Sequence, residues 1–433
     1  MKMVLNYTNN KIFKIFILSH VFAYFSLTLI PAKAQVSNIS FLILINCLFL
    51  ILVSVSSLLV YLIYPGRNIK KTINAKSMSI RQLFFNVKIV SYGSVFGFLL
   101  VMYDRVVLRG IDYTKGLRLA RYQWLSSTGG SLPSIIGNLL IPLGYLCIFF
   151  LIIHRESLPK RYTRLLLMAA VISIIGHSAL NGGRSNLLIA LVFALISFIL
   201  KKNSLKKMFL MINPKIVKTL PIIVIAIGYV SIITFSSASM GNLDMKSLAY
   251  LGIQSLYGQV TKGFENLSIF GEVGYLIAYL IAYLYHGQWT AQIAYSLSIR
   301  DGNYTFYSFS VILNQLGILD QPLKQGYFSE TGAFISLPGA FYYDFGYFGL
   351  IILSLLVGIL FGIALIIINH NKYISGIKLS FIYYILFILF MSPILPAYGL
   401  IYTNFVVFAF VALDVVNNFK FRNKVNWVLE IVK

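Results

Sequence analysis

A cluster of cations lies between two apolar segments, within residues 103–124. Its members are Arg105, Arg109, Lys115, Arg118 and Arg121, and only two acidic residues accompany them. Guanidinium groups bind phosphate oxygens through paired hydrogen bonds. Because Arg118 and Arg121 are spaced i, i+3, a helix places both on one face. The pattern favours binding of phosphate or pyrophosphate, with an amphipathic helix on anionic lipid headgroups as the alternative.

A short turn carrying one charge is the second candidate. The segment Asn181-Gly-Gly-Arg-Ser-Asn186 separates two apolar runs, and Arg184 is its only charged residue. The two glycines allow a tight bend that leaves backbone amides free to hold an anion beside the guanidinium. The same residues suit an ordinary hairpin whose arginine reaches the interface, so both interpretations stay open.

Carboxylates and aromatic residues form the third group. Its members are the carboxylates Glu272 and Asp344, the cation Arg300, and the aromatic residues Tyr257, Trp289 and Trp124. Carboxylates can orient or deprotonate a hydroxyl, and aromatic faces stack on sugar rings. Asp344 stands just inside an apolar segment, where an unpaired carboxylate is costly. Catalysis and an ion pair with an external arginine are the two alternative roles for Asp344.

Membrane helices are expected to hold these residues in place. The chain has 433 residues, 58% of them hydrophobic and 11% charged, whereas soluble domains have about a quarter charged residues. Apolar runs of ~20 residues, enough to cross ~30 Å of hydrocarbon, recur along the whole chain. The sequence therefore predicts an all-α polytopic integral membrane protein, with residues 1–433 in one transmembrane domain.

About ten spans, within a range of 10–12, are expected. They cover residues 12–31, 39–64, 82–103, 132–153, 164–181, 186–200, 218–236, 339–369, 379–394 and 399–417. Residues 273–285 are too short and too rich in tyrosine to span alone, and a re-entrant or interfacial helix is predicted for them.

Charge sets the expected orientation. With both termini in the cytoplasm, 25 of the 36 Lys and Arg residues lie inside and nine of the twelve acids lie outside, as the positive-inside rule requires. The long outer loops are then residues 104–131 and 237–338, and loops of that length are usually functional. The net charge of +24 is spread over short loops. A nucleic-acid binder would concentrate it in one patch, so nucleic acid is not an expected partner.

Familiar metal and nucleotide motifs are missing from the sequence. It contains no Asp-x-Asp, no phosphate-binding Gly-x-x-x-x-Gly-Lys-Ser/Thr loop, no His-Glu-x-x-His and no Cys-x-x-Cys. We therefore expect no metal and no cofactor. His177 lies within an expected span, where packing or a hydrogen bond is the simplest role.

Three segments carry a family resemblance. They are Ala179-Leu-Asn-Gly-Gly-Arg-Ser-Asn-Leu-Leu188, Ser255-Leu-Tyr-Gly-Gln-Val-Thr-Lys-Gly-Phe264 and Gly339-Ala-Phe-Tyr-Tyr-Asp-Phe-Gly-Tyr-Phe-Gly349. With the order of spans and loops over the whole chain, they resemble the O-antigen polymerase family (Wzy-type, oligosaccharide repeat-unit polymerase). The resemblance implies a bacterial inner-membrane glycosyltransferase that moves a growing glycan from undecaprenyl pyrophosphate to a hydroxyl of the next lipid-linked repeat unit, on the periplasmic face.

The resemblance also implies roles and partners. Arg184, Arg118 and Arg121, with Arg105 and Arg300 in reserve, would hold the pyrophosphates. Asp344 or Glu272 would orient or deprotonate the attacking hydroxyl, while Tyr257, Trp124 and Trp289 would contact sugars. The implied partners are the lipid-linked oligosaccharide, the bilayer, a chain-length regulator and a flippase. A flippase or transporter of the same lipid-linked sugar, an O-antigen ligase and a structural membrane subunit remain as alternatives.

Overall fold

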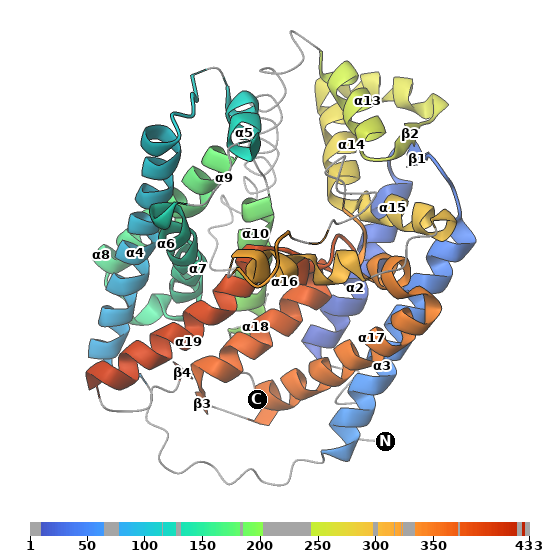
Figure 1. Ribbon diagram of the computed structural model, residues 1–433. Helices are drawn as coiled ribbons and strands as arrows, with labels where there is room; N and C mark the ends of the chain where they lie inside the picture. Colours follow the sequence, from blue (N-terminus) through green and yellow to red (C-terminus); the bar gives the residue numbers. More distant parts are fainter. Residues whose placement is uncertain are drawn as a thin grey trace. The chain divides into compact units, whose positions relative to one another are not determined.

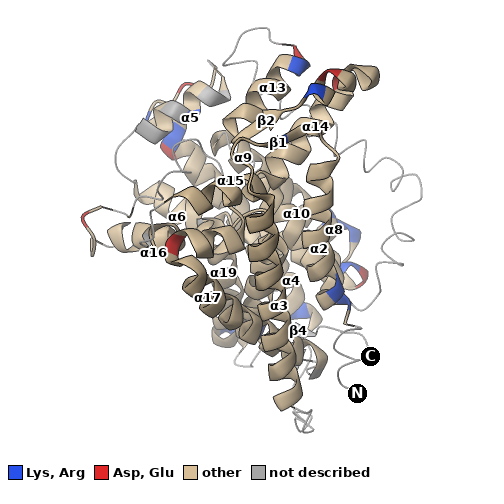
Figure 2. Cartoon of the chain, turned by 90° about the vertical axis from the view of Figure 1, so that its right-hand side faces the viewer, with Lys and Arg blue, Asp and Glu red and all other residues tan. Residues whose placement is uncertain are grey.

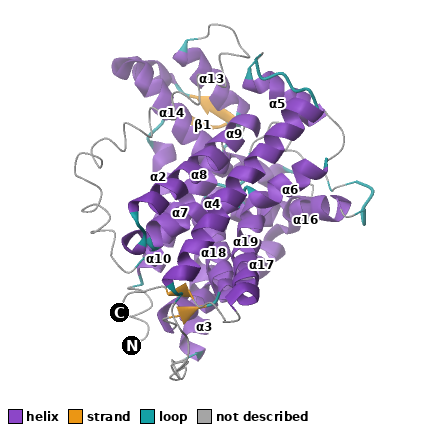
Figure 3. Ribbon diagram, turned by 90° about the vertical axis from the view of Figure 1, so that its left-hand side faces the viewer, coloured by secondary structure: helices purple, strands orange, loops and turns teal. Residues whose placement is uncertain are grey.

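A computed structural model of the chain describes a large part of its residues. The described ranges are 10–64, 78–114, 116–126, 131–181, 185–201, 244–297, 302–315, 317–321, 323, 334–370, 373–421 and 427–428. Almost all regular structure in them is helical (Figures 1 and 3). The predicted all-α class is confirmed for these ranges.

The chain forms two compact units built from interleaved segments. Unit 1 comprises Met1–Arg67, Leu243–Ile366 and Ile385–Ile401, and unit 2 comprises Asn68–Asn242, Ile367–Tyr384 and Tyr402–Lys433. Helices α17 (Leu337–His370), α18 (Gly376–Met391) and α19 (Ile401–Phe421) have residues in both.

Unit 1 combines long apolar helices with a group of shorter elements. Besides most of α17, its elements are α2 (Lys11–Thr28), β1 (Ala32–Ala34), α3 (Ile39–Ile63), α13 (Met245–Ser255), β2 (Gly258–Val260), the 3₁₀ helices η4 (Lys262–Phe270), η5 (Ala294–Ser296) and η6 (Ala397–Gly399), α14 (Gly271–Tyr285), α15 (Gly287–Ile293) and α16 (Asn303–Gln315).

Strand β1 follows α2, and it pairs with β2, which lies in the expected long outer loop. They pair antiparallel, with Ala32 opposite Val260 and Ala34 opposite Gly258. The core of the unit lies between α2, α3 and α17, where Phe16 meets Phe49 and Phe361 edge to face. Edge-to-face contacts between aromatic rings add to the stabilisation that burial provides.

Unit 2 is a helical bundle with two short strands. Its elements are α4 (Ile80–Tyr103), η1 (Asp104–Leu108), α5 (Leu117–Ser126), α6 (Leu132–Leu140), α7 (Leu143–Ile153), η2 (Arg155–Ser157), α8 (Lys160–Ala170), η3 (Val171–Ile175), α9 (Gly176–Asn181), α10 (Ser185–Leu200), β3 (Tyr373–Ile374), β4 (Trp427–Val428) and parts of α18 and α19.

Helix α4 begins and packs in ways that its sequence explains. Ser79 and Gln82 form a capping box that satisfies amides of the first turn. Further along, Gly97 faces Gly137 of α6, and a Cβ at Gly137 would lie 2.7 Å from the Gly97 carbonyl oxygen. The glycines thus allow the two backbones to approach closely, as small residues do in membrane helix pairs.

Eight helical segments in the described ranges are long and apolar enough to cross a membrane. They are Lys11–Thr28, Ile39–Ile63, Ile80–Leu108, Leu132–Ile153, Lys160–Asn181, Lys262–Tyr285, Leu337–Asn369 and Tyr402–Phe421. Lys, Arg, Asp and Glu gather mainly near helix ends and in connecting segments (Figure 2). These helices identify a multi-pass membrane protein.

The expected spans fit this pattern with two differences. Residues 186–200 and 379–394 correspond to the shorter apolar helices Ser185–Leu200 and Gly376–Met391, and residues 218–236 lie outside the described ranges. Residues 273–285, expected to form a re-entrant or interfacial helix, lie within Lys262–Tyr285, which belongs to the long apolar group. Gly271, at φ 60°, breaks it, so α14 alone measures about 22 Å, less than the hydrocarbon core.

Candidate functional site

The first cation cluster begins inside a helix rather than in a loop. The outer loop was expected to begin at residue 104, but α4 continues through Asp104–Leu108 as one π-helical turn. Asp104 and Arg105 are 0% and 1% exposed. Such π turns occur frequently at functional sites, because the extra residue turns side chains away from the regular helix faces.

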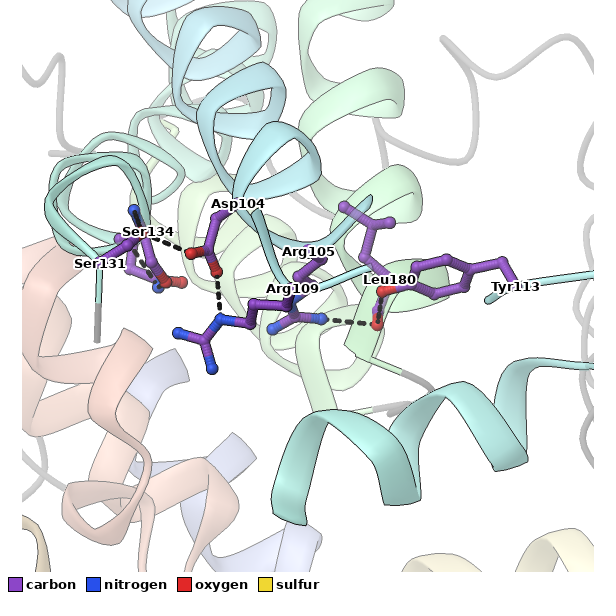
Figure 4. A network of polar contacts seen from close by, with 8 residues as sticks. Asp104, Arg105, Arg109, Tyr113, Ser131, Ser134 and Leu180 are labelled. Carbon is purple, nitrogen blue, oxygen red and sulfur yellow. Dashed lines mark hydrogen bonds and ion pairs between the residues drawn. The ribbon is translucent and has the colours of Figure 1, made fainter. Parts of the chain in front are cut away.

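Asp104 is engaged by neighbouring side chains. Its Oδ2 lies 2.9 Å from Nε of Arg109, and its Oδ1 accepts a hydrogen bond from the Ser131 hydroxyl (Figure 4). Ser131 also caps α6 by accepting the N–H of Ser134 at 3.2 Å. The carboxylate therefore holds the start of α6 against η1 and neutralises one arginine of the cluster.

Arg105 is held differently. Its Nη1 donates to the carbonyl oxygen of Leu180 at 2.5 Å, and the Tyr113 hydroxyl donates to the same oxygen at 3.0 Å (Figure 4). The guanidinium carbon lies 4.3 Å from the ring centroid of Trp124, a cation–π contact. Within the described ranges, no carboxylate lies within ion-pair distance of Arg105, and its buried Nε has no acceptor.

These contacts join two of the predicted motifs. Leu180 stands at the end of α9, directly before Asn181 and the turn that carries Arg184. The arginine-rich segment and the glycine turn are far apart in sequence, yet Arg105 and Tyr113 bind the backbone beside that turn. Arg184 itself lies outside the described residues.

A buried polar network adjoins this corner. In it Nε2 of His177 lies 2.8 Å from Nδ2 of Asn181 and 3.1 Å from the hydroxyl of Tyr402, which donates to Oδ1 of Asn138 at 2.7 Å. The side-chain amide of Asn186 lies 3.0 Å from Nδ1 of His177. His177 thus forms the hydrogen bonds expected of a histidine in a span.

Two other members of this network, Asn138 and Tyr402, were not predicted from the sequence. Asn186 is the last residue of the predicted glycine turn, and each of the three comes from a different helix. A polar residue inside an expected span is the one signal that could have pointed to them.

The other cations of this cluster lie on α5. This helix covers Leu117–Ser126, so the helix expected around Arg118 and Arg121 is present. Arg121 is exposed, and the side chain of Arg118 is not described. Trp124, on the same helix, is partly exposed and covers Arg105.

Asp344 belongs to unit 1 and holds a helix start. It is 0% exposed, and its two carboxylate oxygens accept the backbone N–H groups of Tyr304 at 3.2 Å and Thr305 at 2.5 Å. These amides lie in the first turn of α16, where an anion is favoured by the helix dipole. Arg300, expected as a further cation, lies outside the described residues.

The remaining predicted residues of unit 1 occupy three environments. Glu272 is exposed in the first turn of α14. Tyr257 has φ 62° at the corner before β2, where its carbonyl accepts the N–H of Gln35 at 3.0 Å. Trp289 is 3% exposed, and a Cβ on Gly258 would lie 2.4 Å from its ring. Trp289 therefore packs against β2, with no open face for a sugar ring.

His286 is a second buried histidine, with both nitrogens used. Its Nδ1 donates to the Tyr283 carbonyl at 2.8 Å, and its Nε2 accepts the N–H of Phe334 at 2.8 Å. Burial lowers the pKa of His286 to about 4. The imidazole therefore stays neutral near pH 7 and fixes the backbone before α17.

In the described ranges, no group of three or more His, Cys, Asp or Glu residues could hold a metal ion. Comparison with known proteins gave no match to a protein family, a characterised protein or a solved structure. The function is therefore inferred from the chain's own residues.

Proposed function

We propose that this chain is a polymerase of lipid-linked oligosaccharide repeat units. It transfers a glycan from undecaprenyl pyrophosphate to a hydroxyl of the next lipid-linked unit, on the periplasmic face of the bacterial inner membrane. Both termini then lie in the cytoplasm. The pattern of Lys and Arg along the sequence and the resemblance to O-antigen polymerases support this proposal.

The observation that carries the proposal is the environment of Arg105. A buried cation without a carboxylate partner is costly. Within the described structure Arg105 contacts a carbonyl oxygen, an indole face and the side chain of Tyr113, and the nearby acid, Asp104, is engaged by Arg109. An anionic ligand would offset this cost. A pyrophosphate is the anion that the proposed reaction brings to the site.

The reaction needs such cations because charge develops on the leaving group. The acceptor oxygen forms a bond to the anomeric carbon, the bond from that carbon to the pyrophosphate oxygen breaks, and the hydroxyl proton passes to a base. Arginines that bind the departing pyrophosphate stabilise its added charge. In this proposal Arg105 takes that role with Arg184, Arg118 and Arg121, and Arg300 remains a reserve.

The base is a carboxylate in this proposal. Asp344 already accepts two backbone N–H groups, whereas Glu272 is exposed. Glu272 is therefore the better candidate to accept the proton, and Asp344 the better candidate to hold α16 in place. Trp124 and Tyr257 would contact sugars, because both retain some exposure.

The test is the surface-glycan ladder of a cell that lacks this chain. Single repeat units on the lipid core would support a polymerase. Loss of all core-attached glycan would instead indicate a ligase or a flippase. In complemented cells, Arg184→Ala should abolish long chains while the protein level holds, and unchanged chain length would reject the arginine's role. Arg184→Lys separates charge from the two-pronged geometry of the guanidinium.

A further inference from the structure

Positive charge gathers around the start of α8 in unit 2. Within residues 154–164 the cations are Arg155, Lys160, Arg161 and Arg164. The single acid of this segment, Glu156, lies 3.6 Å from Nζ of Lys201. All four cations are exposed, and within the described ranges no carboxylate lies within ion-pair distance of any of them. The start of α8 therefore carries positive charge that the described chain does not neutralise.

Three of these cations stand where a helix disfavours them. The first turn of a helix has free N–H groups and the positive end of the helix dipole, so anions are favoured there and cations are not. The first turn of α8 contains no acid, and Pro159 at its N-cap provides no side-chain acceptor. Helix α4, by contrast, begins with a capping box. The cations at 160, 161 and 164 thus indicate that an anion from outside the chain completes this end of α8.

The length of the helical segment places these cations at the depth of lipid headgroups. Helices α8, η3 and α9 together form the apolar segment Lys160–Asn181, which has 22 residues. At 1.5 Å per residue it measures about 33 Å, close to the ~30 Å of the hydrocarbon core. When the segment crosses the bilayer, its first turn lies at the boundary between hydrocarbon and headgroups, where the phosphates of lipids also lie.

The helix face that carries the arginines continues as an exposed apolar stripe. Arg161, Arg164, Met168 and Val171 follow one another at intervals of three or four residues, which places them on one face, and all four are exposed. The buried residues of α8 lie on the opposite face and are Leu166, Ala169 and Ala170. A free phosphate would use the cations alone. A phosphate that carries acyl chains matches both the charged turn and the apolar stripe.

Helix α4 extends this surface. Its Phe84 stacks on Tyr162 of α8, with ring centroids 4.6 Å apart. Arg81 is exposed and precedes Phe84 by three residues, so it lies on the same side of α4, near the start of α8. Tyrosine is enriched at membrane interfaces, where one part of the ring is in lipid and the hydroxyl is in water. Two neighbouring helices thus present cations and an aromatic pair at the same end.

We propose that the start of α8, with Arg81 of α4, binds the phosphate headgroup of an anionic phospholipid whose acyl chain lies along Met168 and Val171. Arginine pairs with phosphate oxygens through two parallel hydrogen bonds. The site differs from the one proposed for pyrophosphate, because Arg105 stands beyond the other end of α4. The proposed function supplies only the leaflet: in its orientation this end faces the cytoplasm, where anionic lipids attract basic segments.

The test measures lipid binding to the full chain, purified in a neutral detergent. Dioleoyl phosphatidylglycerol and dioleoyl phosphatidylethanolamine are titrated in mixed micelles, and binding is followed by microscale thermophoresis. The wild-type chain should bind phosphatidylglycerol about thirtyfold more tightly, the effect expected of two or more cations beside an anionic headgroup. The double variant Arg161→Gln, Arg164→Gln should lose most of this preference because its binding of phosphatidylglycerol weakens.

Two controls separate this site from general charge and from folding. The double variant Arg161→Lys, Arg164→Lys retains both charges and should retain most of the preference. Lys378→Gln removes an exposed cation from the first turn of α18, where Asp414 already accepts the N–H of Gly376, and it should bind both lipids as the wild type does. Melting temperatures accompany each titration. If the double glutamine variant unfolds, the single variants decide, and each should reduce the preference about fivefold.

Four results would overturn the proposal. The first is equal binding of the two lipids by the wild-type chain. The second is an undiminished preference in the folded glutamine variants. The third is an equal loss in Lys378→Gln, which would show unspecific attraction to positive charge. The fourth is displacement of phosphatidylglycerol by excess inorganic phosphate, which would show a site for free phosphate. Failure of the proposed function appears elsewhere, as an unchanged glycan ladder in cells without the chain, and it leaves these titrations unaffected.

Discussion

The polar groups buried in the two units differ in how fully they are paired. In unit 1, His20 forms a hydrogen bond with Ser392 at 2.7 Å. Both imidazole nitrogens of His286 and both carboxylate oxygens of Asp344 are also hydrogen-bonded. In unit 2, Nε of the charged Arg105 is buried without a hydrogen-bond partner, whereas the unpaired buried side-chain atoms described in unit 1 are the neutral hydroxyls of Ser336 and Ser354. A paired group stabilises the fold by itself, whereas an unpaired buried charge lowers its stability unless a ligand supplies the partner. Under the proposed function, the contrast separates residues that hold the structure from an arginine that binds the substrate.

The largest effect is expected at Arg105. Arg105→Met should lower the yield of long glycan chains about a hundredfold, the usual cost of removing a group that stabilises transition-state charge. It should leave the melting temperature equal or higher, because the lost charge has no carboxylate partner within the described structure.

The measurements are the glycan ladder and a thermal-shift assay on purified protein. Lys88→Met removes an exposed cation from the same helix and should change neither. A clear fall in the melting temperature of Arg105→Met would show that this arginine supports the fold, and the contrast between the units would be lost.

An intermediate effect is expected for His286 in unit 1. Burial lowers the pKa of His286 to about 4. The neutral imidazole therefore contributes fully to the stability of the fold above the ordinary pKa of 6.5, and this contribution is lost as pH falls toward 4. The loss amounts to about 3 kcal/mol of unfolding free energy. His286→Gln, which can still accept the N–H of Phe334, should show a shallower decline in melting temperature from pH 7 to 4.5. Parallel declines for both proteins would contradict this role.

The smallest effect is expected for Asp344, and it tests whether Asp344 or Glu272 is the catalytic carboxylate. Asp344→Asn replaces a charged acceptor of two helix amides by a neutral group and should cost about 2 kcal/mol of stability, with chain length restored when the protein level is matched. Glu272→Gln, at an exposed position, should leave the melting temperature unchanged and shorten the glycan chains. If Asp344→Asn abolished long chains at normal stability, the catalytic carboxylate would be Asp344.

Helix type and position were predictable because they depend on local composition. Runs of apolar residues at Ile39–Ile63 and Leu132–Ile153 identify membrane helices by their length alone. The helix around Arg121 follows equally from local spacing. The break at Gly271 was not predicted, since many glycines occur in helices and only the backbone shows which one takes a positive φ.

Local composition is enough to identify a helical membrane protein with a group of arginines between two of its spans. Which arginine is buried depends on folding, because the π-helical turn and the carbonyl of Leu180, 75 residues from Arg105, set its surroundings. The same holds for Asp344, whose partners lie 39 and 40 residues away, and for Trp289, buried against Gly258. Local pattern fixes where a helix forms, but the pairing of a buried polar group depends on residues that only folding brings together.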